Sequence, residues 1–243
     1  TAAIRLYELV KKENVLLSDV TDAFSVERLN KDFFKGYKER YKKFCDFLTG
    51  NAKDNRDYVK KLLGRLVFLQ FLQKKGWMCV PAGSDAWEGG DKAYMQNLVE
   101  RYKDNDRLLS DVLEPLFFNT LNKARPDDIA DSRLGENIKI PYLNGGLFDR
   151  DSLDKKNIDF PYAYFQELME FFSEYNFTID ENDPDDAEVG IDPEMLGHIF
   201  ENLLEDNKDK GAFYTPKEIV QYMCRETIVQ YLKSHVDEQL YSA

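Results

Sequence analysis

The stretch from Gly211 to Val220 contains a complete start for an α-helix. Thr215 suits the N-cap position, because its hydroxyl can accept a hydrogen bond from a free backbone N–H of the first turn. Pro216 then falls at the first helical position, where its missing N–H costs nothing, and Glu218 can close a capping box. The free N–H groups of such a start attract an anion such as a carboxylate or phosphate. Most capped helix starts bind no ligand, so a purely structural cap is the alternative.

The order of residues in this stretch is more specific than its capping pattern, because it resembles a known motif. Gly-Ala-Phe-Tyr-Thr-Pro, followed by an Ile-Val helix, resembles the segment that opens the methyltransferase domain of amino-adenine DNA methyltransferases. In that family the segment packs against the methionine end of S-adenosylmethionine. The resemblance implies that Thr215 faces the methionine carboxylate and that Phe213 and Tyr214 wall the same pocket. The cofactor-binding residues it implies are Ala212, Phe213, Tyr214, Thr215 and Pro216.

Three further strings resemble one group within that family, the single-chain type IIG restriction-modification enzymes. In these enzymes a helical region joins an N-terminal nuclease to the methyltransferase. The strings are Arg-Leu-Val-Phe-Leu-Gln-Phe-Leu-Gln-Lys-Lys-Gly-Trp at 65–77, Pro-Tyr-Leu-Asn-Gly-Gly-Leu-Phe at 141–148 and Pro-Glu-Met-Leu-Gly-His-Ile-Phe-Glu at 193–201. Type I modification subunits share the opening segment, but Leu-Asn-Gly-Gly-Leu-Phe favours type IIG. The resemblance extends over about residues 25–232.

The resemblance implies three parts: an N-terminal segment at 1–24 that follows an absent nuclease domain, a helical connector at 25–205, and the start of the methyltransferase domain at 206–243. The family needs an Asp-Pro-Ala-Cys-Gly-Ser-Gly type loop for the cofactor and an Asn-Pro-Pro-Tyr type loop for the adenine. Neither occurs before Ala243, and Thr1 is not a methionine. We therefore expect a piece of a longer protein that catalyses nothing alone. S-adenosylmethionine, and Mg²⁺ for the nuclease, are expected only in the full-length protein.

Two alternatives remain open: a nuclease fragment and a helical interaction scaffold without cofactor contact. Many nucleases hold a metal with an acidic residue and an acidic-x-Lys triplet. Asp149 followed by Asp154-Lys155-Lys156 has that spacing, but it lies in a polar loop without a strand pattern. The two histidines, His198 and His235, have no neighbouring Ser or Cys that suggests a catalytic triad.

Two long helices are predicted in the first third of the chain. The first, about Val26 to Leu48, has one apolar stripe made of Val26, Leu29, Phe33, Tyr37, Tyr41, Phe44 and Leu48. Its other faces carry five lysines, for which a solvated surface is a simpler interpretation than a DNA contact: Lys31, Lys35, Lys38, Lys42 and Lys43.

The second helix, about Arg56 to Lys75, is apolar around nearly its whole circumference, which is typical of the centre of a core. Arg65 is the only charge in its apolar part. A buried guanidinium needs a buried carboxylate or several carbonyls, and it cannot transfer protons at neutral pH. We therefore predict a structural ion pair. Gly76 should end the helix and Trp77 should pack back on it.

Shorter elements complete a mainly α-helical fold, a globular multi-helix bundle with at most a small β hairpin. We expect a loop at 22–24 and a turn at 138–149 plugged into the core by Tyr142, Leu143, Leu147 and Phe148. Pro115 should kink or divide the second of the helices at 92–102 and 108–122. The other expected helices lie at about 4–10, 160–177 and from Asp192 to Leu204, where His198 is expected to pack as a structural imidazole.

The composition bounds the partners of the chain. Its 243 residues carry 45 Asp and Glu against 33 Lys and Arg, a net charge of −12 that opposes binding to a DNA backbone. We therefore expect weak or no DNA binding by this chain alone, with double-stranded DNA as the partner of the full-length protein. Cys45, Cys79 and Cys224 read as free thiols in a reducing, cytoplasmic compartment. No apolar run is long enough to span a membrane.

Overall fold

The computed structural model describes residues 2–177 except 13, 24, 144 and 157, and then residues 190, 191, 197, 215 and 217–235. The chain consists of two compact units, Thr1–Pro193 and Glu194–Ala243. The helix expected from Asp192, with His198, lies outside the described residues apart from Gly197. The domain limits at 24/25 and 205/206 stay predictions.

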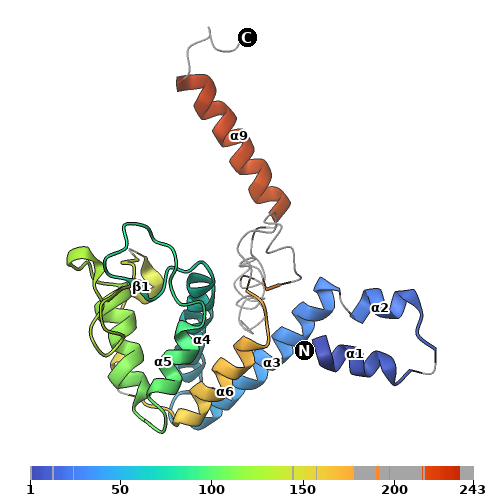
Figure 1. The fold of residues 1–243 in the computed structure, drawn as a ribbon, viewed down its shortest axis with the longest axis horizontal. Coiled ribbons are helices and arrows are strands. Elements are labelled where there is room, and N and C mark those ends of the chain that lie inside the picture. The colour runs from blue at the N-terminus through green and yellow to red at the C-terminus, as the bar shows by residue number, and fades with distance from the viewer. Residues whose placement is uncertain are drawn as a thin grey trace. The chain divides into compact units, whose positions relative to one another are not determined.

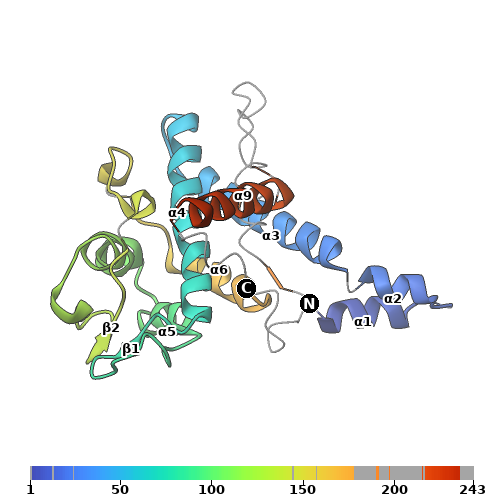
Figure 2. The same ribbon diagram turned by 90° about the horizontal axis from the view of Figure 1, so that it is seen from above.

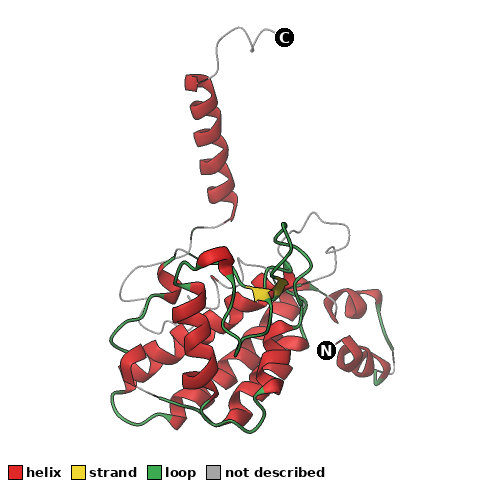
Figure 3. Cartoon of the chain, turned by 60° about the vertical axis from the view of Figure 1, so that its left-hand side comes forward, coloured by secondary structure: helices red, strands yellow, loops and turns green. Residues whose placement is uncertain are grey.

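Helices dominate the first unit, which confirms the mainly α-helical fold (Figure 1). Its α-helices are α1 (Ala2–Val10), α2 (Leu17–Ala23), α3 (Val26–Phe47), α4 (Ala52–Lys74), α5 (Tyr94–Arg101) and α6 (Tyr162–Ser173). Strands β1 (Val80–Pro81) and β2 (Ile138–Lys139) pair antiparallel, with Val80 opposite Lys139. Figure 3 shows how small this hairpin is beside the helices. Among the described helices, none combines the length and the apolar character that a membrane span requires.

Ser25 is the N-cap of helix α3. Its Oγ accepts a hydrogen bond of 3.2 Å from the backbone N–H of Arg28. The predicted stripe faces the core: Leu29, Phe33, Tyr37 and Phe44 are buried. Phe33 stacks on Phe171 of α6, with ring centroids 5.2 Å apart. The two helices cross closely, because a Cβ placed on Gly36 would lie 2.5 Å from Cε2 of Phe171.

Helix α4 lies at the centre of the unit, between α3 and α5 (Figure 2), and contacts both. Asn51 caps it by accepting hydrogen bonds from the N–H groups of Lys53 and Asp54. Most of its side chains from Tyr58 to Gln73 are buried on every face, as predicted. Gly76 ends it at a positive φ of 74°. Trp77 donates its N–H back to the carbonyl of Leu72, and its side chain is partly covered, with 39% exposed.

The expected division of the helix at 108–122 by Pro115 is wrong, because helical backbone continues through Glu114, which has φ −63° and ψ −44°. The helix consists of two π-helical segments, η1 (Leu109–Leu113) and η2 (Pro115–Leu121), both with buried apolar residues. The expected loop at 22–24 is wrong, because α2 continues through Ala23, whose side chain is buried. Short 3₁₀ helices complete the unit: η3 (Pro126–Asp128), η4 (Gly146–Phe148) and η5 (Asp154–Lys156).

The turn after β2 is anchored differently from the prediction. Phe148 is buried, but Leu143 is half-buried and Tyr142 and Leu147 are exposed by 38% and 36%. The physical reason is the orientation of the backbone: the carbonyl of Leu147, and not its side chain, turns inward to accept a hydrogen bond from Arg65.

In the second unit the described element is α9 (Lys217–His235). It begins two residues after Thr215, in agreement with the predicted helix start. Its apolar side chains are exposed on this chain: Ile219, Val220, Tyr222, Met223, Ile228, Tyr231 and Leu232.

Candidate functional site

The predicted cofactor site lies mostly beyond what the structure describes. Ala212, Phe213, Tyr214 and Pro216 are outside the described residues, while Thr215 is described and exposed. Thr215 lies two residues before Lys217, the first residue of α9, which agrees with a residue that faces the first turn of that helix. Its role toward a cofactor stays a prediction.

The best-defined polar cluster surrounds Arg65. Its side chain is 2% exposed and makes a bidentate pair with Asp154, which is 3% exposed. The distances are 2.7 Å from Nη1 to Oδ1 and 3.0 Å from Nη2 to Oδ2. The guanidinium also donates to the carbonyls of Leu147 and Asp149, at 2.8 and 3.0 Å. The predicted structural ion pair is therefore confirmed, and Arg65 has both a carboxylate and carbonyls.

Lys61, one helical turn before Arg65, extends this cluster. Its Nζ lies 3.1 Å from Oδ2 of Asp154, 2.8 Å from Oδ2 of Asp151 and 3.0 Å from the carbonyl of Asp149. One face of α4 thus holds the whole segment 147–154. Two of the strings that carry the family resemblance meet here, since Arg65 begins the first and Leu147 belongs to the second.

The cluster sets the protonation state of Asp154. Burial alone raises the pKa of this carboxyl, but hydrogen bonds from Arg65, the backbone N–H of Asp151 and Lys61 overcome burial and lower the pKa to about 2. Asp154 is therefore ionised at neutral pH. An ionised acid whose oxygens are both engaged by cations stabilises the fold and is not available for proton transfer.

This geometry argues against the nuclease alternative. Asp154 is occupied by Arg65 and Lys61, Asp149 accepts from Asn122, and Lys156 pairs with Asp54 at 3.1 Å. Within the described ranges, no three His, Cys, Asp or Glu side chains gather closely enough to hold a metal ion. The sequence analysis considered Asp154 only as a metal ligand and missed it as the partner of Arg65. A signal for this turn was present in the sequence, because an aspartate such as Asp151 often accepts hydrogen bonds from backbone N–H groups two or three residues later. Here Asp151 accepts from the N–H groups of Leu153 and Asp154.

A second polar cluster, which the sequence analysis missed, consists of three glutamines. Gln73 donates to Gln70 at 2.7 Å and to Gln96 at 3.0 Å, and Gln96 donates to Gln70 at 3.1 Å. Oε1 of Gln73 also accepts from the N–H of Met95, in the first turn of α5. These amides line a cleft of about 310 Å³. The three amides form hydrogen bonds with one another, and Gln73 accepts from a free N–H in the first turn of α5. The cluster therefore stabilises the packing of α4 on α5.

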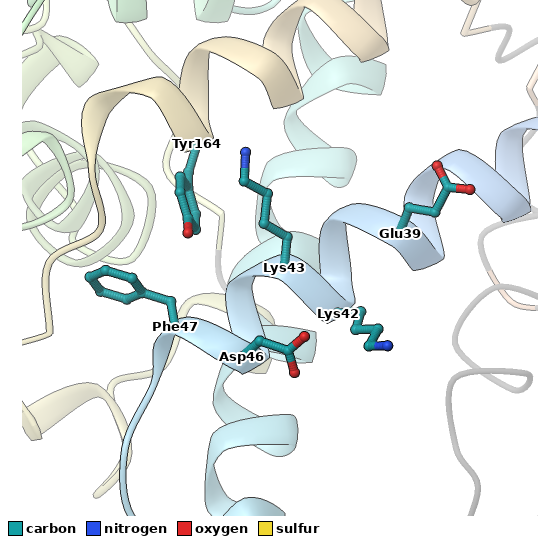
Figure 4. A pocket seen from close by; sticks show the side chains of 6 residues that line it. All are labelled: Glu39, Lys42, Lys43, Asp46, Phe47 and Tyr164. Carbon is teal, nitrogen blue, oxygen red and sulfur yellow. The ribbon is translucent and has the colours of Figure 1, made fainter.

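A more open cleft of about 580 Å³ lies between α3 and α6, lined by Glu39, Lys42, Lys43, Asp46, Phe47 and Tyr164. Lys43 reaches Tyr164, with Nζ 4.4 Å from the ring centroid, and forms an ion pair of 2.6 Å with Glu167. Figure 4 shows Lys43 directed toward Tyr164 and Lys42 pointing away from it. The charge of Lys43 is therefore used within the fold, whereas that of Lys42 is directed outward. The three cysteines are free thiols, as expected.

Comparison with known proteins points to the restriction-modification class. No protein-family model and no solved structure matches the chain. A similar curated protein is one from Methanocaldococcus jannaschii named "putative type II restriction enzyme and methyltransferase". The chain is 28% identical to it over 223 residues, which cover 86% of the chain and 18% of that protein. The chain thus spans less than a fifth of this relative, and the similarity supports a relationship to restriction-modification enzymes.

Proposed function

We propose that this chain is the helical connector of a type IIG restriction-modification enzyme, together with the opening segment of its methyltransferase domain. The whole enzyme would transfer a methyl group from S-adenosylmethionine to an adenine amino group and cut DNA nearby. The observation that carries the proposal is the 28% identity, extending over 86% of the chain, to the relative named as a type II restriction enzyme and methyltransferase. Such an enzyme acts on double-stranded DNA in the cytoplasm.

The packing of the first unit supports a connector role. Helix α4 is mostly buried from Tyr58 to Gln73 and holds the segment 147–154 through Lys61 and Arg65. The contacts of Lys61 and Arg65 fix the segment 147–154 on the central helix. Such a unit suits a connector that keeps two catalytic domains at a fixed distance. The Mg²⁺ of the nuclease would belong to another domain, because the described acids of this chain are engaged in ion pairs or dispersed over the surface.

The opening segment suits one end of the cofactor. Thr215 is exposed and lies two residues before the start of α9, so its hydroxyl and the first N–H groups of the helix can receive a carboxylate. Bound S-adenosylmethionine would supply the methyl group. Its methionine end would be held by Ala212, Phe213, Tyr214, Thr215 and Pro216. Thr215 would bind the carboxylate, and Phe213 and Tyr214 would wall the same pocket.

Methyl transfer from tritium-labelled S-adenosylmethionine to duplex DNA tests the proposal. The full-length protein should label adenine, and the 243-residue chain by itself should label nothing. A full-length protein that transfers no methyl group to any duplex, while binding another protein tightly, would favour the alternative of a helical interaction scaffold.

A further inference from the structure

Three exposed lysines form a continuous stripe on α3. Lys35, Lys38 and Lys42 follow one another at intervals of three and four residues, which places them on the same face of the helix. At 1.5 Å per residue the stripe is about 10 Å long. Lys31 continues the same face one turn earlier. We call Lys35, Lys38 and Lys42 the lysine stripe.

The helix that carries the stripe is held firmly. On the opposite face of α3, Phe33, Tyr37 and Phe44 are at most 1% exposed, so the stripe cannot turn inward without unpacking the core. Two neighbouring cations are used internally: Lys43 pairs with Glu167, and Arg40 lies over the ring of Phe171.

The stripe itself has a different environment. Among the described residues, no carboxylate lies within ion-pairing distance of Lys35, Lys38 or Lys42. The nearest acids on this side of α3 are Glu39 and Asp46, at the border of the open cleft. Asp32 is engaged by Arg5 at 3.0 Å. Within the described part of the chain, the three lysines are exposed and form no ion pair, although Glu39 and Asp46 share their side of the helix.

The net charge of the chain conceals this local excess. Residues 178–210 contain 12 acidic and 2 basic residues, which account for most of the net charge of −12. Residues 28–61, which include α3 and the first part of α4, contain 11 basic and 5 acidic residues. The net charge of the whole chain therefore does not describe residues 28–61, which carry a local excess of positive charge.

We propose that the lysine stripe binds the phosphate backbone of duplex DNA. Its length of about 10 Å equals about three of the 3.4 Å axial intervals between successive phosphates of one strand, so its three charges can contact phosphates within one short stretch of backbone. Phe47 is exposed at the last turn of α3, beyond Lys42, but the stripe itself carries no row of rings on which successive unpaired bases could stack, which disfavours single strands. The apolar face of α3 is buried, which disfavours insertion into a membrane surface. The inference rests on the proposed function for its choice of DNA, and it adds the surface through which the connector would hold that DNA.

The test measures binding of the full-length protein to a duplex of about 40 base pairs at several salt concentrations. In the triple variant Lys35→Gln, Lys38→Gln, Lys42→Gln, affinity should fall about tenfold or more near 0.1 M salt. The slope of log K against log salt should become shallower by about 2 to 3, since each phosphate contact contributes about 0.9. The triple Lys→Arg variant keeps the charges and should bind like the parent protein.

The control removes the same charge elsewhere, in the triple variant Lys92→Gln, Lys103→Gln, Lys123→Gln, whose lysines are exposed on other elements. It should leave the slope unchanged. An equal loss in both triple variants, or none in the stripe variant of a protein that still methylates DNA, overturns the inference alone. Stripe-dependent binding to phosphatidylserine vesicles with unchanged DNA binding also overturns it. A parent protein that neither binds nor methylates DNA overturns the proposed function as well.

Discussion

Arg65 of α4 and Asp154 of η5 form a bidentate ion pair with N–O distances of 2.7 and 3.0 Å, although they are 89 residues apart in the chain. Both side chains are almost completely buried. The pair connects the central helix of the fold to the segment that follows the hairpin. A buried charge that loses its partner is strongly destabilising, so this pair is a sensitive point of the fold.

Removing either partner should therefore be costly, and the two losses should not add. Arg65→Leu and Asp154→Leu should each lower the free energy of unfolding by about 3–5 kcal/mol, and the double variant should lose clearly less than the sum. Urea unfolding followed by circular dichroism measures this. The exposed pair Arg107–Asp111, at 3.2 Å, provides the control, and Arg107→Leu should cost less than about 1 kcal/mol. Equal costs at the two pairs would contradict a structural role for Arg65.

The same pair should make stability depend on pH in acid. The pKa of Asp154 is about 2 in the fold, below its ordinary value of 3.8. Its ionised form therefore adds stability that is fully present above about pH 4 and is lost as the pH falls toward 2. This contribution is about 2 kcal/mol. The difference in unfolding free energy between the parent and Asp154→Asn should shrink by about that amount from pH 5 to pH 2. A difference that stays constant over this range would show that Asp154 does not titrate as stated.

The close crossing of α3 and α6 predicts a cost for Gly36→Ala. Alanine normally favours a helix over glycine by about 1 kcal/mol. Here the added Cβ would meet Cε2 of Phe171 at 2.5 Å, so we expect destabilisation by about 1–3 kcal/mol. Thermal unfolding of Gly36→Ala, and of the same change combined with Phe171→Leu, tests the cause. If the second change restores no stability, the ring of Phe171 is not what requires the glycine.

Thr215→Ala separates a cofactor contact from a simple helix cap. In the full-length enzyme it should weaken S-adenosylmethionine binding by about 1–2 kcal/mol, the usual value of a charge-assisted hydrogen bond. A cap alone would instead cost about 1 kcal/mol of folding stability. Calorimetric titration and the thermal midpoint should be measured on the same variant. A lower midpoint with unchanged cofactor affinity would leave Thr215 as a cap.

Local periodicity predicted the long helices because it reflects which face is buried. Phe33, Tyr37 and Phe44 on α3, and the all-round apolar α4, are cases in which composition and spacing determine the element. The sequence also indicated that Arg65 needed a carboxylate. It could not identify Asp154, since a contact over 89 residues depends on the whole path of the chain.

Other features were not predictable for the same reason. Leu147 is apolar and was expected in the core, but the needs of Arg65 turn its carbonyl inward and leave its side chain partly exposed. Helix α2 has only seven residues, among them Ser, Asp and Thr, which favour turns when considered alone. The Gln70–Gln73–Gln96 network depends on how α4 meets α5, which no local pattern reveals.

The central claim is that this chain connects the catalytic parts of an adenine-specific restriction-modification enzyme. Its most direct test is methyl transfer from labelled S-adenosylmethionine to duplex DNA, measured with the full-length protein and with the 243-residue chain at equal concentration. We predict N6-methyladenine in the DNA treated with the full-length protein and only background label with the chain. Methyl transfer by the 243-residue chain, or none by the full-length protein on any adenine-containing duplex, would contradict the account.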